Sequence, residues 1–489
     1  MRQEPHKRLK NLWVGIILAG LLLSGIACEK KSESSDQEKT AVTARATSTP
    51  KPAATPSVLT KRGPNESFYT IQQSLDVGGT FYLYASIKDL LKKKVQIFEP
   101  IVKQTGMPPE ALKMYTAVNQ VIDHLGLYGV QDIGISTMRD GDLNRTKAFI
   151  HLPEGRAKGI PSIWGGDAHP LQMLDRAPDS TQVLITGDVD ANAVWDLFRT
   201  MVQDIGGEKT LTQMDLNLNQ WGMQSSINIP ALVPTLGGEV AFLMDQTPSL
   251  KMVIPTNSGV PLSIDAPRLA LMVRLQKDDL YESIRISLSK TGKARSETVE
   301  GKLRMALLVV PFQPLWPVSP VLATDGEYMY ISTHAEYVKT LSAGAPQKSL
   351  RQSEEFQKLI TGLPTDANGC FFVSERLKKT YMETVKSLVA ANTPNPANGG
   401  PDMAQMLQKI FDQQGPVSGS VGLRVNQANG ILFVTRSQAD MAEFIPSAMA
   451  GVVGMVVAVT LPEYMHAQTQ LQQAQMQVFQ NKLDTQAAQ

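Results

Sequence analysis

The chain is poor in cysteine, in excess charge and in catalytic signatures. It has two cysteines among 489 residues, and its formal net charge is +1. A near-neutral chain lacks the strong field that attracts nucleic acid, so we expect no nucleic-acid partner. Phosphate-binding loops, dinucleotide fingerprints, H-E-x-x-H and G-x-S-x-G motifs are all absent from the sequence. The enzyme classes that depend on these motifs therefore lose their usual support.

The first 28 residues have the layout of a bacterial export signal. Four basic residues among the first ten precede an uncharged apolar stretch, residues 12–27, which ends in small residues. Its end, Ser24-Gly25-Ile26-Ala27-Cys28, resembles a lipobox, the site at which a bacterial lipoprotein is cleaved before a lipid-bearing cysteine. The resemblance implies that Cys28 carries lipid, and several acyl chains are expected because a single chain anchors weakly. An uncleaved membrane helix with an incidental cysteine is the alternative.

A linker and a buried thiol are predicted next. Residues 29–66 contain almost no large apolar side chain and are rich in Ser, Thr, Pro, Ala and Lys. Such a segment cannot offset its ordering entropy, so we predict a disordered tether with ends about 35 Å apart. Cys370 lies in the apolar run GCFFV, which favours a buried free thiol over a nucleophile.

The remaining body predicts an α+β fold. Short apolar strands are followed by amphipathic helices in five irregularly spaced, duplicated units, at residues 78–98, 179–205, 267–284, 327–341 and 368–385. Asp140-Gly141 between two alternating runs predicts a hairpin. Consecutive strands without helices predict mostly antiparallel sheets with helices on one face. We expect two similar domains, residues 67–232 and 233–443.

Part of the body resembles an uncharacterised family. Residues 125–156, 174–198 and 318–341 contain repeated strand and helix units similar to those of a domain of unknown function in large bacterial envelope proteins. The resemblance covers about residues 67–441. It implies architecture and an envelope location, not an activity.

A second apolar stretch lies near the carboxyl terminus. Residues 444–462 contain no charge and would span roughly 28 Å as a helix, close to the thickness of a bilayer core. This length fits a transmembrane or partner-binding helix as well as a helix buried in the body. Residues 463–489 form a Gln-rich tail, for which a solvated helix is favoured over a short coiled coil.

One acidic run begins like a calcium loop. Asp188, Asp190 and Asn192 have the spacing of the first ligands, but Ala193 replaces the required Gly and Arg199 stands where a bidentate Glu is needed. A helix N-cap at Asp190 explains the same residues. We therefore predict a cap and no calcium site.

Three other site candidates are weak. Ser287 and Lys290 match S-x-x-K but lack the companion motifs of penicillin-binding enzymes, which indicates a chance match. Asp167 and His169 are the best metal-ligand pair, yet zinc needs three or four ligands. Four tryptophans are candidates for a glycan-binding surface, although Trp195 is expected to pack in the core: Trp164, Trp195, Trp221 and Trp316.

These observations favour an envelope lipoprotein that binds a protein, glycan or membrane partner without catalysis, cofactor or metal. The body would face the periplasm or the exterior, with the membrane held through lipidated Cys28. Two alternatives remain open. One is a hydrolase whose carboxylate site assembles only in the fold. The other is a structural component of a secretion or pilus-like assembly that uses residues 444–462.

Overall fold

Alternating apolar residues build one extended antiparallel sheet. The computed structural model describes residues 66–87, 116, 119–156, 158–254, 261–309, 318–344, 348–392 and 417–438. The predicted signal peptide, the linker up to residue 65, the 444–462 stretch and the Gln-rich tail lie outside these described residues. The strands are β1 (Phe81–Ser86), β2 (Asp132–Asp140), β3 (Leu143–His151), β4 (Val183–Asp188), β5 (Leu236–Ile254), β6 (Leu262–Leu275), β7 (Ala294–Glu300), β8 (Leu303–Leu308), β9 (Val321–Thr324), β10 (Tyr328–Ser332), β11 (Gly369–Val373), β12 (Ser420–Gln427) and β13 (Gly430–Ser437).

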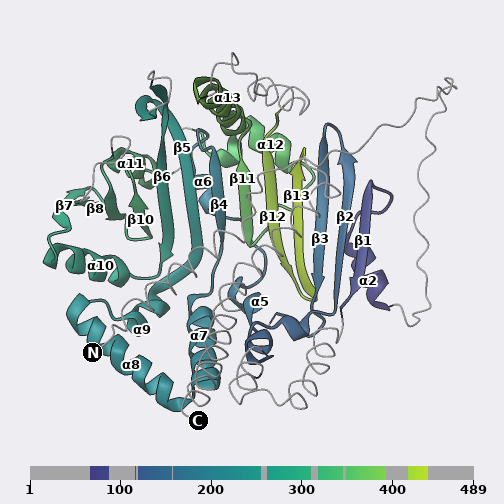
Figure 1. The fold of residues 1–489 in the computed structure, drawn as a ribbon, viewed down its shortest axis with the longest axis horizontal. Helices are drawn as coiled ribbons and strands as arrows, with labels where there is room; N and C mark the ends of the chain where they lie inside the picture. Colours follow the sequence, from purple (N-terminus) through teal and green to yellow (C-terminus); the bar gives the residue numbers. More distant parts are fainter. Residues whose placement is uncertain are drawn as a thin grey trace, which may run out of the picture. The chain divides into compact units, whose positions relative to one another are not determined.

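The strand order is β1-β2-β3-β13-β12-β11-β4-β5-β6-β10-β9-β8-β7 (Figure 1), and every pair is antiparallel. The predicted α+β class with an antiparallel sheet is confirmed. The helices are α2 (Glu66–Ser74), η1 (Leu127–Gly129), α5 (Ile160–Ile163), α6 (Met173–Arg176), α7 (Ala191–Gly206), α8 (Glu208–Ser225), α9 (Ile229–Leu232), η2 (Val233–Thr235), α10 (Asp279–Lys290), α11 (Ala335–Ser342), η3 (Leu350–Gln352), α12 (Glu354–Ile360) and α13 (Glu375–Asn392).

Three repeat units account for nine of these strands. Each unit has a short helix followed by three strands. The second and third strands form a hairpin, and the second strand also pairs with the first. The three sets are α2 with β1, β2 and β3, then α6 with β4, β5 and β6, then α12 with β11, β12 and β13. Long helices follow the first strand in the second unit (α7 and α8) and the third (α13). Most residues between β1 and β2 lie outside the described part of the chain.

A main-chain hydrogen bond recurs at the same place in all three units. In each unit, the residue just before the first strand donates its N–H to a carbonyl of the second strand. The acceptor residue is the one paired with the first residue of the first strand. The three bonds run from Thr80 to Thr137 (2.8 Å), from Gln182 to Met244 (2.9 Å) and from Asn368 to Arg424 (2.7 Å). Two residues opposing one is the pattern of a β-bulge. The recurrence shows that the units share local geometry as well as element order.

Neighbouring units meet through equivalent strands. The third strands β3 and β13 pair around Lys147 opposite Val434, and the first strands β4 and β11 pair around Ile185 opposite Phe371. Ile185 and Phe371 are each the third residue of their strand. Antiparallel pairing centred on equivalent residues is what a local two-fold axis produces. The first and third units, and the third and second, are therefore joined by local two-fold relations.

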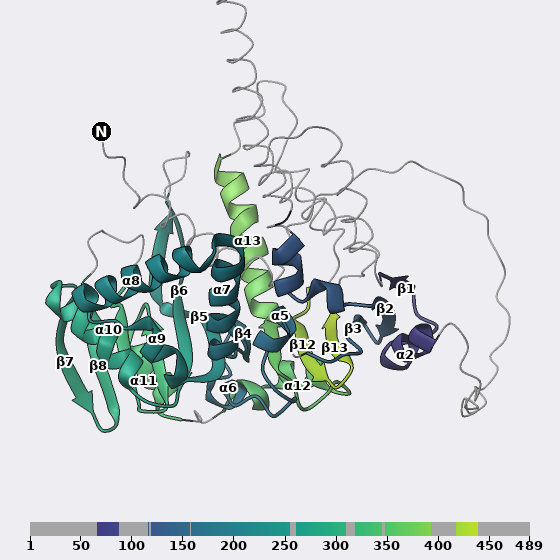
Figure 2. The same ribbon diagram turned by 90° about the horizontal axis from the view of Figure 1, so that it is seen from below.

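Apolar side chains enter clusters on both faces of the sheet. In β10, Tyr328 and Tyr330 join one cluster with residues of α11 and α12, whereas Met329 joins a second cluster with Tyr281 of α10. Figure 2 shows α6, α11 and α12 on one side of the strands and α7, α8 and α13 on the other. The prediction of helices on one face is wrong, because strands such as β10 are apolar on both sides and both sides need cover.

The boundary expected at residues 232 and 233 falls between two paired strands. Val183 to Asp188 of β4 pair with Glu239 to Met244 of β5, and residues 62–438 form one compact unit. Asp140 and Gly141 lie at the end of β2 and in the turn to β3, so the predicted hairpin is confirmed. Within the described residues, no helix combines the length and the apolar character that crossing a bilayer requires.

Candidate functional site

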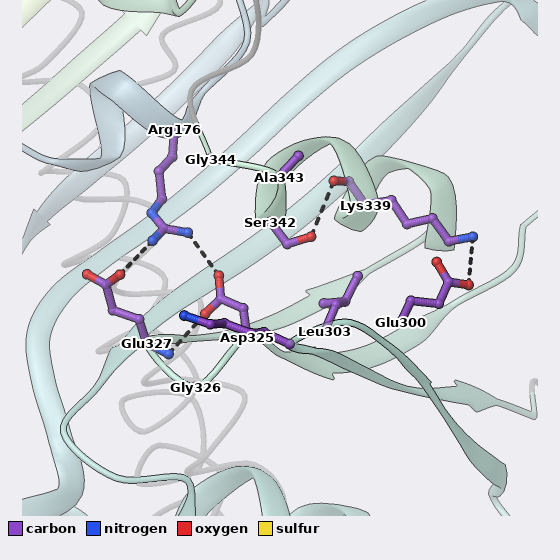
Figure 3. A pocket seen from close by; sticks show the side chains of 11 residues that line it. Arg176, Glu300, Leu303, Asp325, Gly326, Glu327, Lys339, Ser342, Ala343 and Gly344 are labelled. Carbon is purple, nitrogen blue, oxygen red and sulfur yellow. Dashed lines mark hydrogen bonds and ion pairs between the residues drawn. The ribbon is translucent and has the colours of Figure 1, made fainter.

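A depression of 630 Å³ opens beside α6 and α11, next to the β7–β8 and β9–β10 turns (Figure 3). Three cations and three carboxylates line it: Arg176, Lys302, Lys339, Glu300, Asp325 and Glu327. The charges balance, so the depression offers no net field to an anionic or cationic ligand.

Most of these charges are already paired. Arg176 donates to Asp325 (2.9 Å) and to Glu327 (2.6 Å), and Lys339 lies 3.1 Å from Glu300. Figure 3 shows the Arg176 guanidinium reaching both carboxylates of the β9–β10 turn. The same guanidinium lies 4.0 Å from the ring centroid of Tyr328, and burial raises the pKa of this tyrosine to about 12. The network attaches α6 to β10, which is a structural role.

A polar cluster lies at one end of β4, β11 and β12. His169, in the loop before α6, places Nε2 2.9 Å from Asp188 Oδ2 and Nδ1 3.1 Å from the carbonyl oxygen of Pro170. Both ring nitrogens thus face acceptors, an arrangement that suits the imidazolium form. Burial opposes protonation, but the Pro170 carbonyl and Asp188 outweigh it, so the pKa of His169 is raised. In this geometry neither nitrogen is open to take a proton from a substrate.

Buried amide and guanidinium groups complete the cluster. Asn368 Nδ2 donates to Asp188 Oδ2 (2.9 Å), and Arg424 Nη2 donates to the carbonyls of Asn368 (2.7 Å) and Asp188 (3.1 Å). Asn426 Nδ2 donates to the carbonyl of Trp164 (2.9 Å). Burial lowers the pKa of Arg424 to about 10. These donors are used on carboxylate and main-chain oxygens of the molecule itself, so the cluster fixes the loop at residues 164–169 to the sheet.

Gly165 is required for this loop to approach the sheet. Its φ is +83°, and a Cβ placed there would lie 2.5 Å from the Cβ of Asp188. An L side chain would meet both a strained backbone and a steric clash. The close approach lets Asn426 bond the carbonyls around Gly165.

Glu239 has some of the properties of a catalytic carboxylate. It faces Asp188 in the β4·β5 register, and its Oε1 accepts from the Met173 N–H (3.1 Å) and the Thr186 hydroxyl (3.4 Å). Its Oε2 has no hydrogen-bond partner among the described residues. Burial, with Asp188 nearby, raises the pKa of Glu239. However, Glu239 is only 2 % exposed and Asp188 7 %, so a substrate cannot reach this pair directly.

The acidic run of β4 and α7 caps a helix. Asp190 accepts the N–H of Ala193 (3.0 Å) at the start of α7, so the predicted N-cap is confirmed. Asp188 instead bonds His169 and Asn368, and Arg199 bonds Asp215 of α8. The run is thus used in capping and packing.

The remaining candidates are separated or buried. The Asp167 side chain is fully exposed, 3.6 Å from Arg156, while His169 faces Asp188. In the described part of the chain, no three His, Cys, Asp or Glu residues are grouped to hold a metal. Ser287 and Lys290 form the S-x-x-K match. Lys290 donates to the hydroxyl of Ser226, which follows α8 and lies outside that motif.

Cys370 is buried, as predicted, and burial raises its pKa to about 12. The three described tryptophans have different surroundings. Trp164 lies under Arg424, with 5.0 Å between the guanidinium carbon and the ring centroid, and Trp195 contacts Phe198 on α7. Trp221 lies on α8 and is exposed, and Trp316 lies outside the described residues.

The long helices α7 and α8 carry exposed apolar side chains. Val194 and Ile205 of α7 are 40 % and 44 % exposed, and no described residue of either helix is fully buried. On α8, Trp221 is 43 % and Met223 78 % exposed. The expectation that Trp195 packs in the core is not met, because α7 contributes no side chain to either buried cluster.

Sequence reasoning missed Glu239, Asn368, Arg424 and Asn426. Glu239 lies in β5, Arg424 and Asn426 lie in β12, and Asn368 precedes β11. These segments are distant along the chain, so no local spacing marks the four residues. No protein-family model, curated protein or solved structure matches the chain.

Proposed function

We propose that this chain is a lipid-anchored binding protein of a bacterial cell envelope, without catalytic activity of its own. The observation that carries the binding role is the apolar surface of α7 and α8, defined by Val194, Ile205, Leu216, Trp221 and Met223, all at least 40 % exposed. Large apolar side chains left exposed on two successive helices support an interaction site, because soluble proteins rarely expose much apolar surface in one region. The partner that fits it is another envelope protein with an apolar face.

The anchor is proposed from the sequence of residues 1–28. Lipid on Cys28 would hold the chain to a membrane, and residues 29–65 would separate the membrane from the body, which begins at α2. Cys370 supports this assignment because it is 3 % exposed in the core. It therefore offers Cys28 no disulfide, and the Cys28 sulfur remains available for lipid.

The internal hydrogen bonds and ion pairs of these polar clusters support binding over catalysis. Arg176 and Lys339 of the depression in Figure 3 pair with carboxylates, and Arg424 Nη2 bonds main-chain oxygens beside Asp188. A general base needs a position within hydrogen-bond reach of a substrate proton. His169 has both nitrogens occupied, and Glu239 is buried.

A hydrolase is the second candidate, favoured by the raised pKa of Glu239 beside Asp188. It would require the loop at residues 164–169 to open, because that loop covers Asp188. The variant Glu239→Gln separates the two functions. The hydrolase interpretation expects loss of hydrolysis of envelope glycan or peptide by purified protein, whereas the binding interpretation expects no hydrolysis by either protein.

Photo-crosslinking in cells tests the binding role. A photoreactive amino acid in place of Met223 on α8 should give a discrete protein adduct after irradiation. The control is the same substitution at Glu354 on α12, whose side chain is 98 % exposed on the opposite face. An adduct at Met223 and none at Glu354 supports the proposal. Absence of any adduct at Met223, Val194 or Trp221 would contradict it.

A further inference from the structure

Strand β1 is a terminal strand of the sheet, and its outer main-chain groups pair with no other described strand. Among the described strands, β1 and β7 are the two edges. Ile87 donates to the carbonyl of Gln131 (2.8 Å), and antiparallel pairing alternates between bonded and non-bonded residues. The main-chain groups of Tyr82, Tyr84 and Ser86 are therefore directed away from β2.

The two edges differ in their protection. Natural edge strands carry charges or bulges that prevent pairing with another chain. Strand β7 contains Arg295, Glu297 and Glu300, and its pairing is irregular between Ala294 and Glu297. Strand β1 has the sequence FYLYAS, without a charge or proline, and exposes Tyr82 and Leu83 at 37 % and 38 %. The chemistry of β1 thus suits pairing.

Two other first strands of the molecule already pair with each other along the edge that β1 leaves without a described strand. First strands of two units, β4 and β11, pair antiparallel around Ile185 and Phe371. Two bonds flank this centre: Asp188 N–H donates to Asn368 O, and Ser374 N–H donates to Gln182 O, each at 2.8 Å. With three units, one first strand remains without such a mate among the described residues, and it is β1.

We propose that β1 pairs antiparallel with β1 of a second copy of this chain, joining two sheets across a two-fold axis. Leu83 is the third residue of β1, the position held by Ile185 and Phe371. The same geometry places Leu83 opposite Leu83 of the second copy and Tyr82 opposite its Tyr84. Ser86 N–H then donates to the Thr80 carbonyl of the second copy, as Asp188 donates to Asn368 within the chain.

Cysteine substitution at the proposed centre tests the register. Leu83 would occupy a non-hydrogen-bonded pair with Cα atoms about 4.5 Å apart, within the range of about 4.4–6.8 Å that a disulfide spans. Oxidation of full-length Leu83→Cys in detergent should yield a covalent two-chain species linked at the substituted position. The matched control is Val299→Cys on β7, which is 64 % exposed and should remain a single chain.

A second variant removes one bond of the interface without touching β2. Tyr82→Pro deletes an N–H that points outward, a position where an edge strand tolerates proline. By sedimentation in detergent, we expect two chains for the natural sequence and one chain for Tyr82→Pro, with the melting temperature of the body unchanged. A natural protein that sediments as one chain would overturn the proposal. A two-chain form that survives Tyr82→Pro while Leu83→Cys fails to cross-link would also overturn it.

Discussion

At the scale of single residues, buried polar groups tie the sheet to its loops. Arg424 and Asn368 satisfy main-chain and carboxylate oxygens around Asp188, and Asn426 holds the loop that contains Gly165. Buried donors and acceptors without partners are costly. Because each member depends on the others, removal of one should affect stability more than its own bonds suggest.

His169 should make stability depend on pH. Its folded-state pKa is raised above the unfolded value of about 6.5, so its contribution is complete below about pH 6.5 and is lost as pH rises through the folded-state pKa. The histidine is partly exposed, so we expect less than about 1 kcal/mol. Melting temperatures of the natural protein and His169→Gln should differ more at about pH 5.5 than at about pH 8.5. A difference that grows with pH would refute this role.

Asn368 should be among the most sensitive polar positions. It is fully buried, donates to Asp188 and accepts the N–H of Asn426 (2.9 Å). Asn368→Ala leaves both partners unsatisfied and should reduce the free energy of unfolding by about 2–4 kcal/mol. The matched control is Asn217→Ala on exposed α8, where denaturant unfolding should show a change within about 0.5 kcal/mol. Equal effects at both positions would show that the cluster contributes little.

At the scale of elements, the sequence predicts local strand-and-helix units but does not predict which distant strands pair. The strand and helix units around β4 and α7, β6 and α10, β10 and α11, and β11 and α13 follow the predicted ranges. The pairing of β3 with β13 was not predictable, because it joins distant segments whose alternation matches many partners. The amphipathic helix predicted within residues 179–205 is present as α7. Periodicity shows which side of a helix is apolar but not which element covers that side.

The exposure of α8 leads to a contrast between two apolar positions. Trp221 is 43 % exposed on α8, whereas Leu184 of β4 is fully buried in the larger cluster. Trp221→Gln should change the free energy of unfolding by no more than about 0.5 kcal/mol. Leu184→Ala should reduce it by about 2–5 kcal/mol through lost contacts and a cavity. A large loss from Trp221→Gln in denaturant unfolding would mean that α8 is part of the core.

At the scale of the whole molecule, three repeat units form one sheet, and we propose that a lipid anchor holds this body to a membrane. The anchor stays a prediction from residues 1–28. The burial of Cys370 was predictable and is confirmed, because the surrounding run is apolar. The candidate site was largely hidden from the sequence. Asn368 and Arg424 meet across paired strands, and only the folded sheet brings Glu239 to Asp188.

The identity of the mature amino terminus is the most direct test of the proposed lipid anchor at Cys28. Protein isolated from the envelope fraction should be examined by mass spectrometry of its first peptide, with Cys28→Ser as the comparison. We expect a chain that begins at Cys28 and carries the added mass of several fatty acyl chains. The Cys28→Ser protein should lack this mass and should no longer be a lipoprotein. A chain that retains residues 1–27, or begins at an unmodified residue, would contradict the account.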